Sequence, residues 1–245
     1  MLELFKLNDE PSFPSVDLAL EEPNGLLAFG GDLSVKRLQE AYKNGIFPWF
    51  SVGEPLLWWS PNPRGIIYTA DFRPSKSLLK SIRKYSYHAT INHAFNEVIE
   101  RCAKVQRTKE EADNLAQLNA TWIGNDMISA YQALHQSGSA QSIEIWDANN
   151  NLVGGLYGVT VGEVFCGESM FHLQTDASKA AFLALVSHMR SHKLPFIDCQ
   201  MQNPHLASLG CIEIPRSQFK DMLGAGRSKV LSPMVWSKQT IGFDL

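Results

Sequence analysis

The central part of the chain shows strand-like and helix-like hydrophobic patterns in succession. Three neighbouring segments fit strands: 142–146, 152–161 and 163–171. The turn cluster 147–151 and Gly162 separate them, which predicts an antiparallel meander. Residues 177–192 then repeat apolar side chains at helical spacing on one face, and residues 196–200 form a short apolar strand. Antiparallel strands, a helix and another strand are typical of an α+β sheet domain.

The first 70 residues have a different pattern. They are dense in glycine, proline and aromatic residues, which gives turns and short strands rather than long elements. One helix interrupts them, with Ser34 as its N-cap and Gly45 as its stop. We therefore expect a small N-terminal α/β domain over residues 1–70 and a larger domain over residues 71–245.

Helices are also expected at 75–84, from an Asn92 cap to about residue 103, and around 128–138, with a polar surface loop at 104–119. The first of them has a basic face made of Lys76, Lys80, Arg83 and Lys84. Most lysine-rich helix faces are simply solvated. Four like charges without an interleaved acid repel one another, however, so a polyanionic partner is the alternative.

Composition narrows the class of protein. Of 245 residues, 44% are hydrophobic and 19% are charged, which is ordinary for a globular protein. The net charge of −3 argues against extensive phosphate contacts, so any RNA contact is expected to be local. The four cysteines form no CxxC pair, and the chain shows neither a secretory signal nor a membrane-spanning run. We expect a reduced, cytoplasmic protein without a membrane partner.

Three polar residues lie in otherwise apolar strands. Asp198 and Gln200 stand two apart, so both should point to one face. They are either a satisfied structural pair or a pair that orients or deprotonates an incoming amine. Glu168 is either a solvated edge-strand carboxylate or a functional one. Phe165 and Glu168 can serve one site only if the strand bulges, and Gly167 is the expected position of that bulge.

Several familiar sites are absent from the sequence. It contains no Walker loop, no GxGxxG after a strand, no GxSxG elbow and no HExxH. His188 and His192 have metal-binding spacing without an evident third ligand, so we expect a solvated helix side and no metal site. The glycines at 154–158 lie inside a strand pattern, where they more often mark a bulge than a phosphate loop.

Seven segments of the chain form an ordered set of motifs: EPNGLLAFGGDLS (22–34), YKNGIFPWF (42–50), WWSPNPR (58–64), TWI (121–123), FCGESMF (165–171), IDCQ (197–200) and HLASLG (205–210). Together they resemble one family, the leucyl/phenylalanyl-tRNA–protein transferases. Each motif is modest, but their ordered set is highly specific. The resemblance runs from about Phe13 to about Arg216, and the tail beyond it matches poorly.

The resemblance implies a C-terminal domain with the fold of the GCN5-related acetyltransferases (GNAT). Those enzymes usually carry a Gly-rich pyrophosphate loop before the helix that follows their fourth strand. The matching junction here, residues 172–178, contains no glycine. A coenzyme A donor is therefore poorly supported, and no cofactor is expected.

The resemblance also implies the reaction and its partners. A neutral α-amine of an acceptor protein that begins with Arg or Lys attacks the ester of leucyl-tRNA or phenylalanyl-tRNA, and the product is marked for N-end-rule degradation. Positioning supplies much of the rate, and a carboxylate that accepts the amine's proton adds to it. We expect Asp198 to be this base, relayed or oriented through Gln200, and Glu168 to hold the donor's amino group or ribose, or the cationic acceptor. The enzyme is expected to be a monomer.

Binding residues follow from the same resemblance. The apolar pocket for the aminoacyl side chain is expected to be lined by Leu156, Phe165, Phe182, Leu185 and Ile197. Because one or two methylenes change binding by only about 1–3 kcal/mol, Met should be tolerated beside Leu and Phe. The 3′-terminal adenosine is assigned to Trp49, Trp122 and Tyr42, although core packing is the default for such residues. The acceptor stem is assigned to Lys76, Lys80, Arg83 and Lys84.

Two other readings compete with this one. The first is an acetyltransferase-fold enzyme that uses a small acyl donor such as acetyl-CoA, against which the missing Gly-rich loop argues. The second is a non-catalytic module that binds RNA or a degradation signal. The joint presence of Glu168, Asp198 and Gln200 argues against it.

Overall fold

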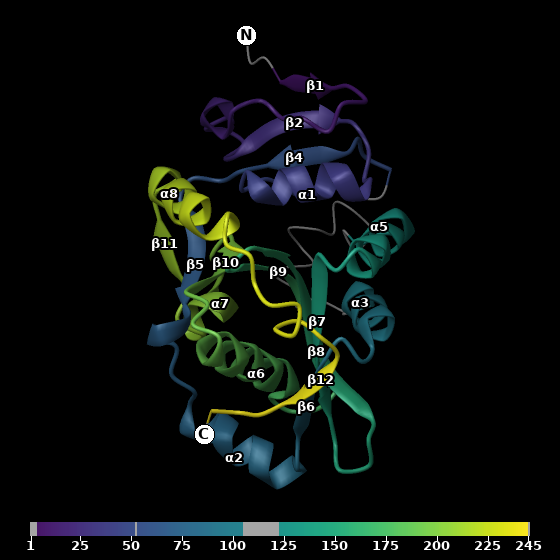
Figure 1. Cartoon of the computed structure of the whole chain (residues 1–245), viewed down its shortest axis with the longest axis vertical. Helices are drawn as coiled ribbons and strands as arrows, with labels where there is room; N and C mark the ends of the chain where they lie inside the picture. Colours follow the sequence, from purple (N-terminus) through teal and green to yellow (C-terminus); the bar gives the residue numbers. More distant parts are fainter. Residues whose placement is uncertain (1–3, 52, 105–122, 245) are drawn as a thin grey trace.

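The computed structural model describes residues 4–51, 53–104 and 123–244, built around two β-sheets (Figure 1). The smaller sheet has the order β1-β2-β4-β3, with β1 Phe5–Leu7, β2 Leu26–Gly30, β3 Phe47–Pro48 and β4 Leu57–Trp59. The larger sheet has the order β11-β5-β10-β9-β8-β7-β6-β12. Its strands are β5 Arg64–Tyr68, β6 His88–Ile91, β7 Ala140–Trp146, β8 Leu152–Val161, β9 Val164–His172, β10 Phe196–Gln200, β11 Ile212–Ile214 and β12 Gln239–Ile241.

The larger sheet contains the expected meander. β7, β8 and β9 are consecutive antiparallel neighbours, with Gly162 at positive φ in the turn between β8 and β9. β10 then pairs with β9 in parallel, after the chain has crossed one face of the sheet as helix α6 Ala177–Ser191. The strand–helix–strand order predicted for residues 142–200 is confirmed.

Two hydrophobic cores lie on opposite faces of this sheet. The first joins it to the small sheet and to helices α1 Val35–Lys43, α3 Phe95–Ala103, α5 Asn125–Gln136 and α8 Arg216–Arg227. It includes Trp58 and Leu38 from the N-terminal part and Tyr131 and Tyr157 from the larger part. The small sheet therefore shares its core with the larger sheet instead of enclosing one of its own.

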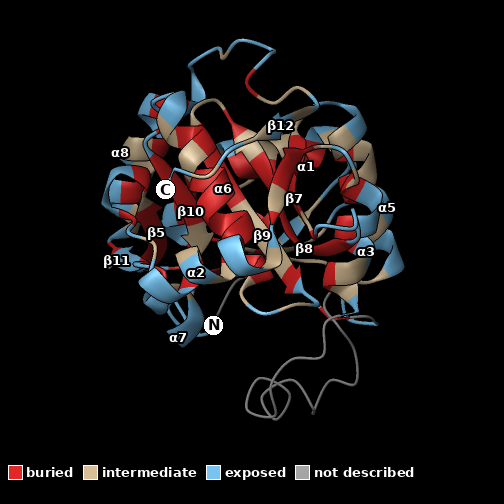
Figure 2. Cartoon of the chain, turned by 90° about the horizontal axis from the view of Figure 1, so that it is seen from below, coloured by how far each residue is buried: buried red, intermediate tan, exposed pale blue. Residues whose placement is uncertain are grey.

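The second core lies under α6 and α2 Lys76–Tyr85. Instead of the single apolar face expected, α6 is buried along most of its length, because α2 and the C-terminal segment cover it as well (Figure 2). A short helix, α7 Pro204–Ser208, and the 3-10 turns Val16–Leu18 and Thr69–Asp71 complete the described elements.

Of the two N-caps expected from the sequence, Ser34 is confirmed and Asn92 is wrong. The Ser34 and Ser75 hydroxyls accept the backbone N–H groups of Arg37 and Leu78, as N-caps do. Asn92 is not a cap: it lies at positive φ and bonds to Gln141 and to the backbone of Ser142 and Trp236. The buried Glu144 carboxylate takes that place, accepting the N–H groups of His93 and Ala94 ahead of α3.

The expected division at residue 70 does not coincide with the division between the sheets. Arg64–Tyr68 is a strand of the larger sheet, so the small sheet ends at Trp59. The predicted loop at 104–119 lies almost wholly outside the described residues. Within the described ranges, each helix is too short or too polar to cross a bilayer.

Candidate active site between β9 and β10

β9 bulges at Glu168. Tyr157 pairs with Ser169 and Gly158 with Gly167, which leaves Glu168 as the extra residue. The bulge thus lies one residue beyond the predicted position. It does not bring Phe165 and Glu168 to one face, as a shared site would need. Phe165 packs in the second core, whereas Glu168 turns to the first core.

The Glu168 carboxyl is held by three side chains from three elements. The Tyr42 hydroxyl of α1 donates to Oε1 at 2.7 Å, and the Tyr131 hydroxyl of α5 donates to Oε2 at 3.1 Å. Gln200 Nε2 of β10 donates to Oε1 at 2.7 Å. The two tyrosine hydroxyls also contact each other, and because each carries a single proton, all three contacts can be hydrogen bonds at once only when the Glu168 carboxyl is protonated. The carboxyl is thereby fixed in direction, while Glu168 stays partly exposed.

This environment changes the acidity of the cluster. Burial raises the pKa of Glu168 to about 8, against the hydrogen bonds from the tyrosines and Gln200, which lower it. Burial and the nearby Glu168 charge raise the pKa values of Tyr42 and Tyr131 well above their usual range. The tyrosines therefore remain neutral donors, and Glu168 can exchange a proton near neutral pH.

Asp198 is committed to a buried ion pair. Arg64 Nε and Nη2 donate to its two carboxylate oxygens at 2.8 and 2.7 Å, and both residues are 1% exposed. Burial disfavours the Arg64 charge, but Asp198 outweighs this and raises the pKa of Arg64. An incoming amine therefore finds no free Asp198 oxygen. The assignment of Asp198 as the base stays a prediction, and Oδ1 also accepts the Gln200 backbone N–H at 2.9 Å.

Gln200 and Asp198 lie on the same side of the sheet, as predicted, although a register shift separates them. Gln200 has a φ of +64°, an unusual conformation for this residue type. The Asp198 carboxylate holds that backbone, and the Gln200 amide reaches across to Glu168. The ion pair therefore determines where the Gln200 amide points.

The strands β9 and β10 part at this position. They pair at Ile197 with Phe165 and at Asp198 with Cys166, and Gln200 and Glu168 follow beyond the ladder. Gly167 leaves room for a side-chain carbon here, because a Cβ added there would make only ordinary van der Waals contacts, with Asp198 O at 3.7 Å and Ile197 Cγ2 at 3.9 Å.

The expected apolar pocket is closed. Leu156, Phe165, Phe182, Leu185 and Ile197 do meet in the second core, but each is at most 3% exposed. They also lie on the face opposite the Glu168 cluster, because neighbouring strand residues point to opposite sides. The five side chains thus come together but pack against one another here, and their role as the aminoacyl pocket stays a prediction.

The predicted tRNA residues are scattered. Tyr42 is 1% exposed and supports Glu168, so it offers no surface to an adenine. Trp49 is partly buried and packs edge-on against Trp59 at 5.5 Å. Trp122 lies outside the described residues. The four basic side chains of α2 are exposed and line one hollow with Leu79, at the end of the molecule opposite the small sheet (Figure 1).

His188 is a buried residue, not a solvated one. It is 6% exposed and bonds through Nε2 to the Val235 carbonyl at 2.7 Å. Among the described residues, no three His, Cys, Asp or Glu side chains gather as a metal ion would need.

Sequence reasoning missed Arg64 and Tyr131. Arg64 ends the WWSPNPR segment, yet no local pattern indicates its pairing with Asp198. Tyr131 was assigned only to the apolar side of a helix. A hydroxyl at the buried end of such a side chain, which needs a partner there, was the available signal.

Comparison with known proteins places these residues in a family. Residues 66–224 match the sequence profile of the leucyl/phenylalanyl-tRNA protein transferases, and residues 31–62 match that of their N-terminal domain. Proteins named leucyl/phenylalanyl-tRNA–protein transferase are similar to this chain over nearly its whole length. One from Pseudoalteromonas atlantica is 55% identical and covers 96% of this chain and 97% of its own. One from Tolumonas auensis is 48% identical and covers 97% of both.

Solved structures add little. L-PGS from Bacillus licheniformis aligns with 80% of this chain and 60% of its own at 9% identity, and its TM-score of 0.35 is too low to support an argument. The sequence similarity carries the assignment. This chain belongs to the leucyl/phenylalanyl-tRNA–protein transferase family.

Proposed function

We propose that this protein transfers leucine or phenylalanine, and also methionine, from aminoacyl-tRNA to the N-terminal amine of proteins that begin with Arg or Lys. The product would be marked for N-end-rule degradation. The reaction is placed where β9 and β10 part. The observation that carries this placement is the Glu168 carboxyl, held there by Tyr42, Tyr131 and Gln200.

Glu168 takes the proton in this proposal. An N-terminal amine has a pKa of about 7.7–8.0, so it arrives mostly as an ammonium ion. The ammonium ion first gives one proton to the solvent, and the Glu168 pKa of about 8 provides a carboxylate that can accept the next one. The neutral amine attacks the ester carbonyl, Glu168 takes the second proton from the nitrogen as the new C–N bond forms, and the C–O bond to the ribose breaks. The proton returns from Glu168 to the departing 3′-oxygen.

Gln200 and the ion pair position the reaction. An amide nitrogen carries two protons, of which Gln200 donates one to Glu168. The other can bond to the ester oxygen as negative charge develops there. Asp198 and Arg64 fix the Gln200 backbone.

The donor side chain would enter between the strands. Gly167 leaves room for it beside Ile197, and Phe165 lies next along the α6 face. Leu156, Phe182 and Leu185 would form the inner wall once the closed core separates. Trp49 and Trp122 would pack the adenosine, and the basic face of α2 would meet the acceptor stem.

We assign the larger sheet to a GNAT-like catalytic domain and the small sheet to an N-terminal domain. Three features support this assignment: the meander β7-β8-β9, the helix α6, and the strand β10, which pairs in parallel with β9 and then separates from it. The protein would act in the cytoplasm as a monomer without a cofactor.

The direct test is a transfer assay. The protein is incubated with labelled leucyl-tRNA and a peptide beginning with Arg, beside the same peptide beginning with Ala. Label should move to the Arg peptide alone. Transfer to neither peptide would contradict the proposed activity, and equal transfer to both would contradict the acceptor preference.

A further inference from the structure

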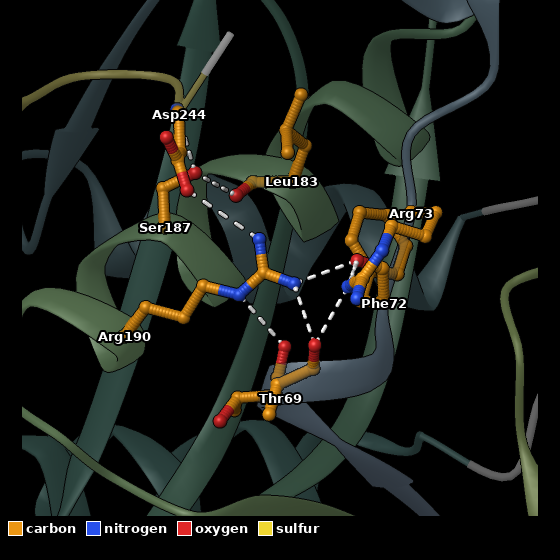
Figure 3. Close-up of polar contacts among 8 residues, drawn as sticks. Thr69, Phe72, Arg73, Leu183, Ser187, Arg190 and Asp244 are labelled. Carbon is orange, nitrogen blue, oxygen red and sulfur yellow. Dashed lines mark hydrogen bonds and ion pairs between the residues drawn. The ribbon is translucent and has the colours of Figure 1, made fainter.

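The C-terminal segment of the chain, residues 228–244, forms a strap over the second core. It leaves α8, passes in front of the sheet and ends near α6 (Figure 1). Its strand β12 pairs with β6 at the sheet edge. At its end, Asp244 bonds through its backbone N–H to Ser187 and pairs with Arg190 at 3.4 Å (Figure 3). The family profile match ends at residue 224, so the strap lies beyond it.

Arg190 also joins the end of the strap to the segment that contains Thr69 and Phe72. Its Nε donates to the Thr69 carbonyl at 2.8 Å and its Nη2 to the Phe72 carbonyl at 2.6 Å (Figure 3). Upstream, the Val235 carbonyl accepts from His188 and the Trp236 carbonyl accepts from Asn92, both at 2.7 Å. Because a carbonyl only accepts, His188 carries its proton on Nε2. Four fixed points thus hold the strap against α6 and β6.

Trp236 is a strap residue whose ring lies against the proposed aminoacyl site. Its ring lies 5.7 Å from the Phe165 ring and 5.2 Å from the His188 ring. Its Nε1 is buried without a hydrogen-bond partner among the described residues. A buried N–H without an acceptor costs about 1–3 kcal/mol. The indole is therefore held by ring packing and not by a hydrogen bond.

Phe165 has little freedom on its other side. Its ring lies so close to Gly158 that a Cβ added there would come within 2.5 Å of Phe165 Cε1. The ring is 0% exposed, with the β8 backbone on one side and Trp236 near another. The Phe165 ring cannot move toward Gly158, because the backbone there cannot shift. It can move only toward the strap, where Trp236 limits its movement.

We propose that Trp236 is a positioning residue that sets the place of the Phe165 ring and thereby the size of donor side chain the enzyme prefers. This inference rests on the proposed function, since it takes Phe165 as a wall of the aminoacyl site. With the indole present, Phe165 stays near the opening between β9 and β10 and limits its depth. Without the indole, Phe165 can withdraw under the strap and admit a larger side chain.

The test compares two donors on one enzyme preparation. The kcat/KM for phenylalanyl-tRNA divided by that for leucyl-tRNA is independent of the folded fraction, so a general loss of stability does not move it. Trp236→Ala should raise this ratio about 5–10-fold. One or two methylenes change the selectivity of an apolar pocket by a similar factor. Trp236→Phe keeps a ring and should stay within about twofold of wild type. Met234→Ala, at a strap residue that is 71% exposed, is the matched control and should leave the ratio unchanged.

A Phe165→Leu variant separates the two ways of failing. If it shifts the ratio while Trp236→Ala does not, the pocket is correct and the role of Trp236 is refuted. If neither variant shifts the ratio in active enzyme, Phe165 does not line the donor site, and the pocket proposal fails with it. Should Trp236→Ala not be recovered folded, Trp236→Leu replaces it, with the same direction of change expected and the same result counting against it.

Discussion

At the scale of single residues, the two carboxylates of the site have opposite environments. Asp198 has a guanidinium on both oxygens and serves as a buried anchor. Glu168 has neutral donors around it and an elevated pKa. Strand spacing left Asp198 open between a structural and a functional role, and the family resemblance favoured it as the base. The contacts favour Glu168, because a carboxylate locked in a buried ion pair must lose that pair to take a proton.

The Asp198–Arg64 pair should therefore contribute to the free energy of unfolding. Asp198→Asn leaves the Arg64 charge buried and unpaired, which should lower the free energy of unfolding by about 3–5 kcal/mol. Replacing both partners, as Arg64→Met with Asp198→Leu, should recover most of that loss. Urea denaturation measures both. An Asp198→Asn protein as stable as wild type but inactive in transfer would restore Asp198 as the base.

Glu168 should make stability depend on pH. Its folded pKa of about 8 lies above the ordinary carboxyl value of 4.5, so its contribution is intact below pH 4.5 and is lost as the pH rises through 8. One pKa unit corresponds to about 1.4 kcal/mol, so Glu168→Gln should gain about 2–4 kcal/mol over wild type between pH 5 and pH 8.5. Glu163→Gln, in the turn before β9, controls for a lost charge. A gain independent of pH would contradict the shifted pKa.

At the scale of elements, hydrophobic periodicity and capping residues predicted the strands and helices that short-range interactions determine. The meander, α6, β10 and the Ser34 cap follow from periodicity and capping chemistry within a few residues. The bulge at Glu168 was found to within one residue, because glycine beside a polar residue in an apolar strand marks it. The sequence did not predict which side of the sheet each site residue lies on. That depends on which helices cover each side of the sheet.

The helix α2 gives a prediction about salt. Its basic face is exposed, and none of its four basic side chains forms an ion pair with an acid of the described residues. If it meets tRNA phosphates, Lys76→Gln with Lys80→Gln should weaken tRNA binding. The slope of log Kd against log salt should also fall, by up to about 1.5. The exposed pair Lys193→Gln with Lys229→Gln is the control. Equal slopes in the two double variants would remove α2 from the RNA footprint.

At the scale of the whole molecule, long-range contacts decide what the sequence could not show. Arg64 meets Asp198, and Tyr42 meets Tyr131 and Glu168, across most of the chain. No pattern within a window of residues carries such pairings. The same holds for β5 and β12, which join the larger sheet from segments that precede and follow its central part.

The shared first core gives a prediction about cooperativity. Trp58 and Leu38 pack in one cluster with Tyr131 and Tyr157, so the small sheet should not unfold alone. Calorimetry should show one transition with equal calorimetric and van't Hoff enthalpies. Trp58→Ala should lower its midpoint without splitting it. Two separated transitions would favour the independent N-terminal domain expected from the sequence.

The most direct measurement of the Glu168 proposal is single-turnover transfer of leucine to an Arg peptide between pH 5.5 and 9, for wild type and Glu168→Gln. Below pH 7 the logarithm of the wild-type rate should rise with a slope near two, since both Glu168 and the peptide amine must lose a proton. The variant should be slower by about 10²–10⁴-fold, with a slope near one and unchanged tRNA binding. A variant with the wild-type rate and slope would contradict the account.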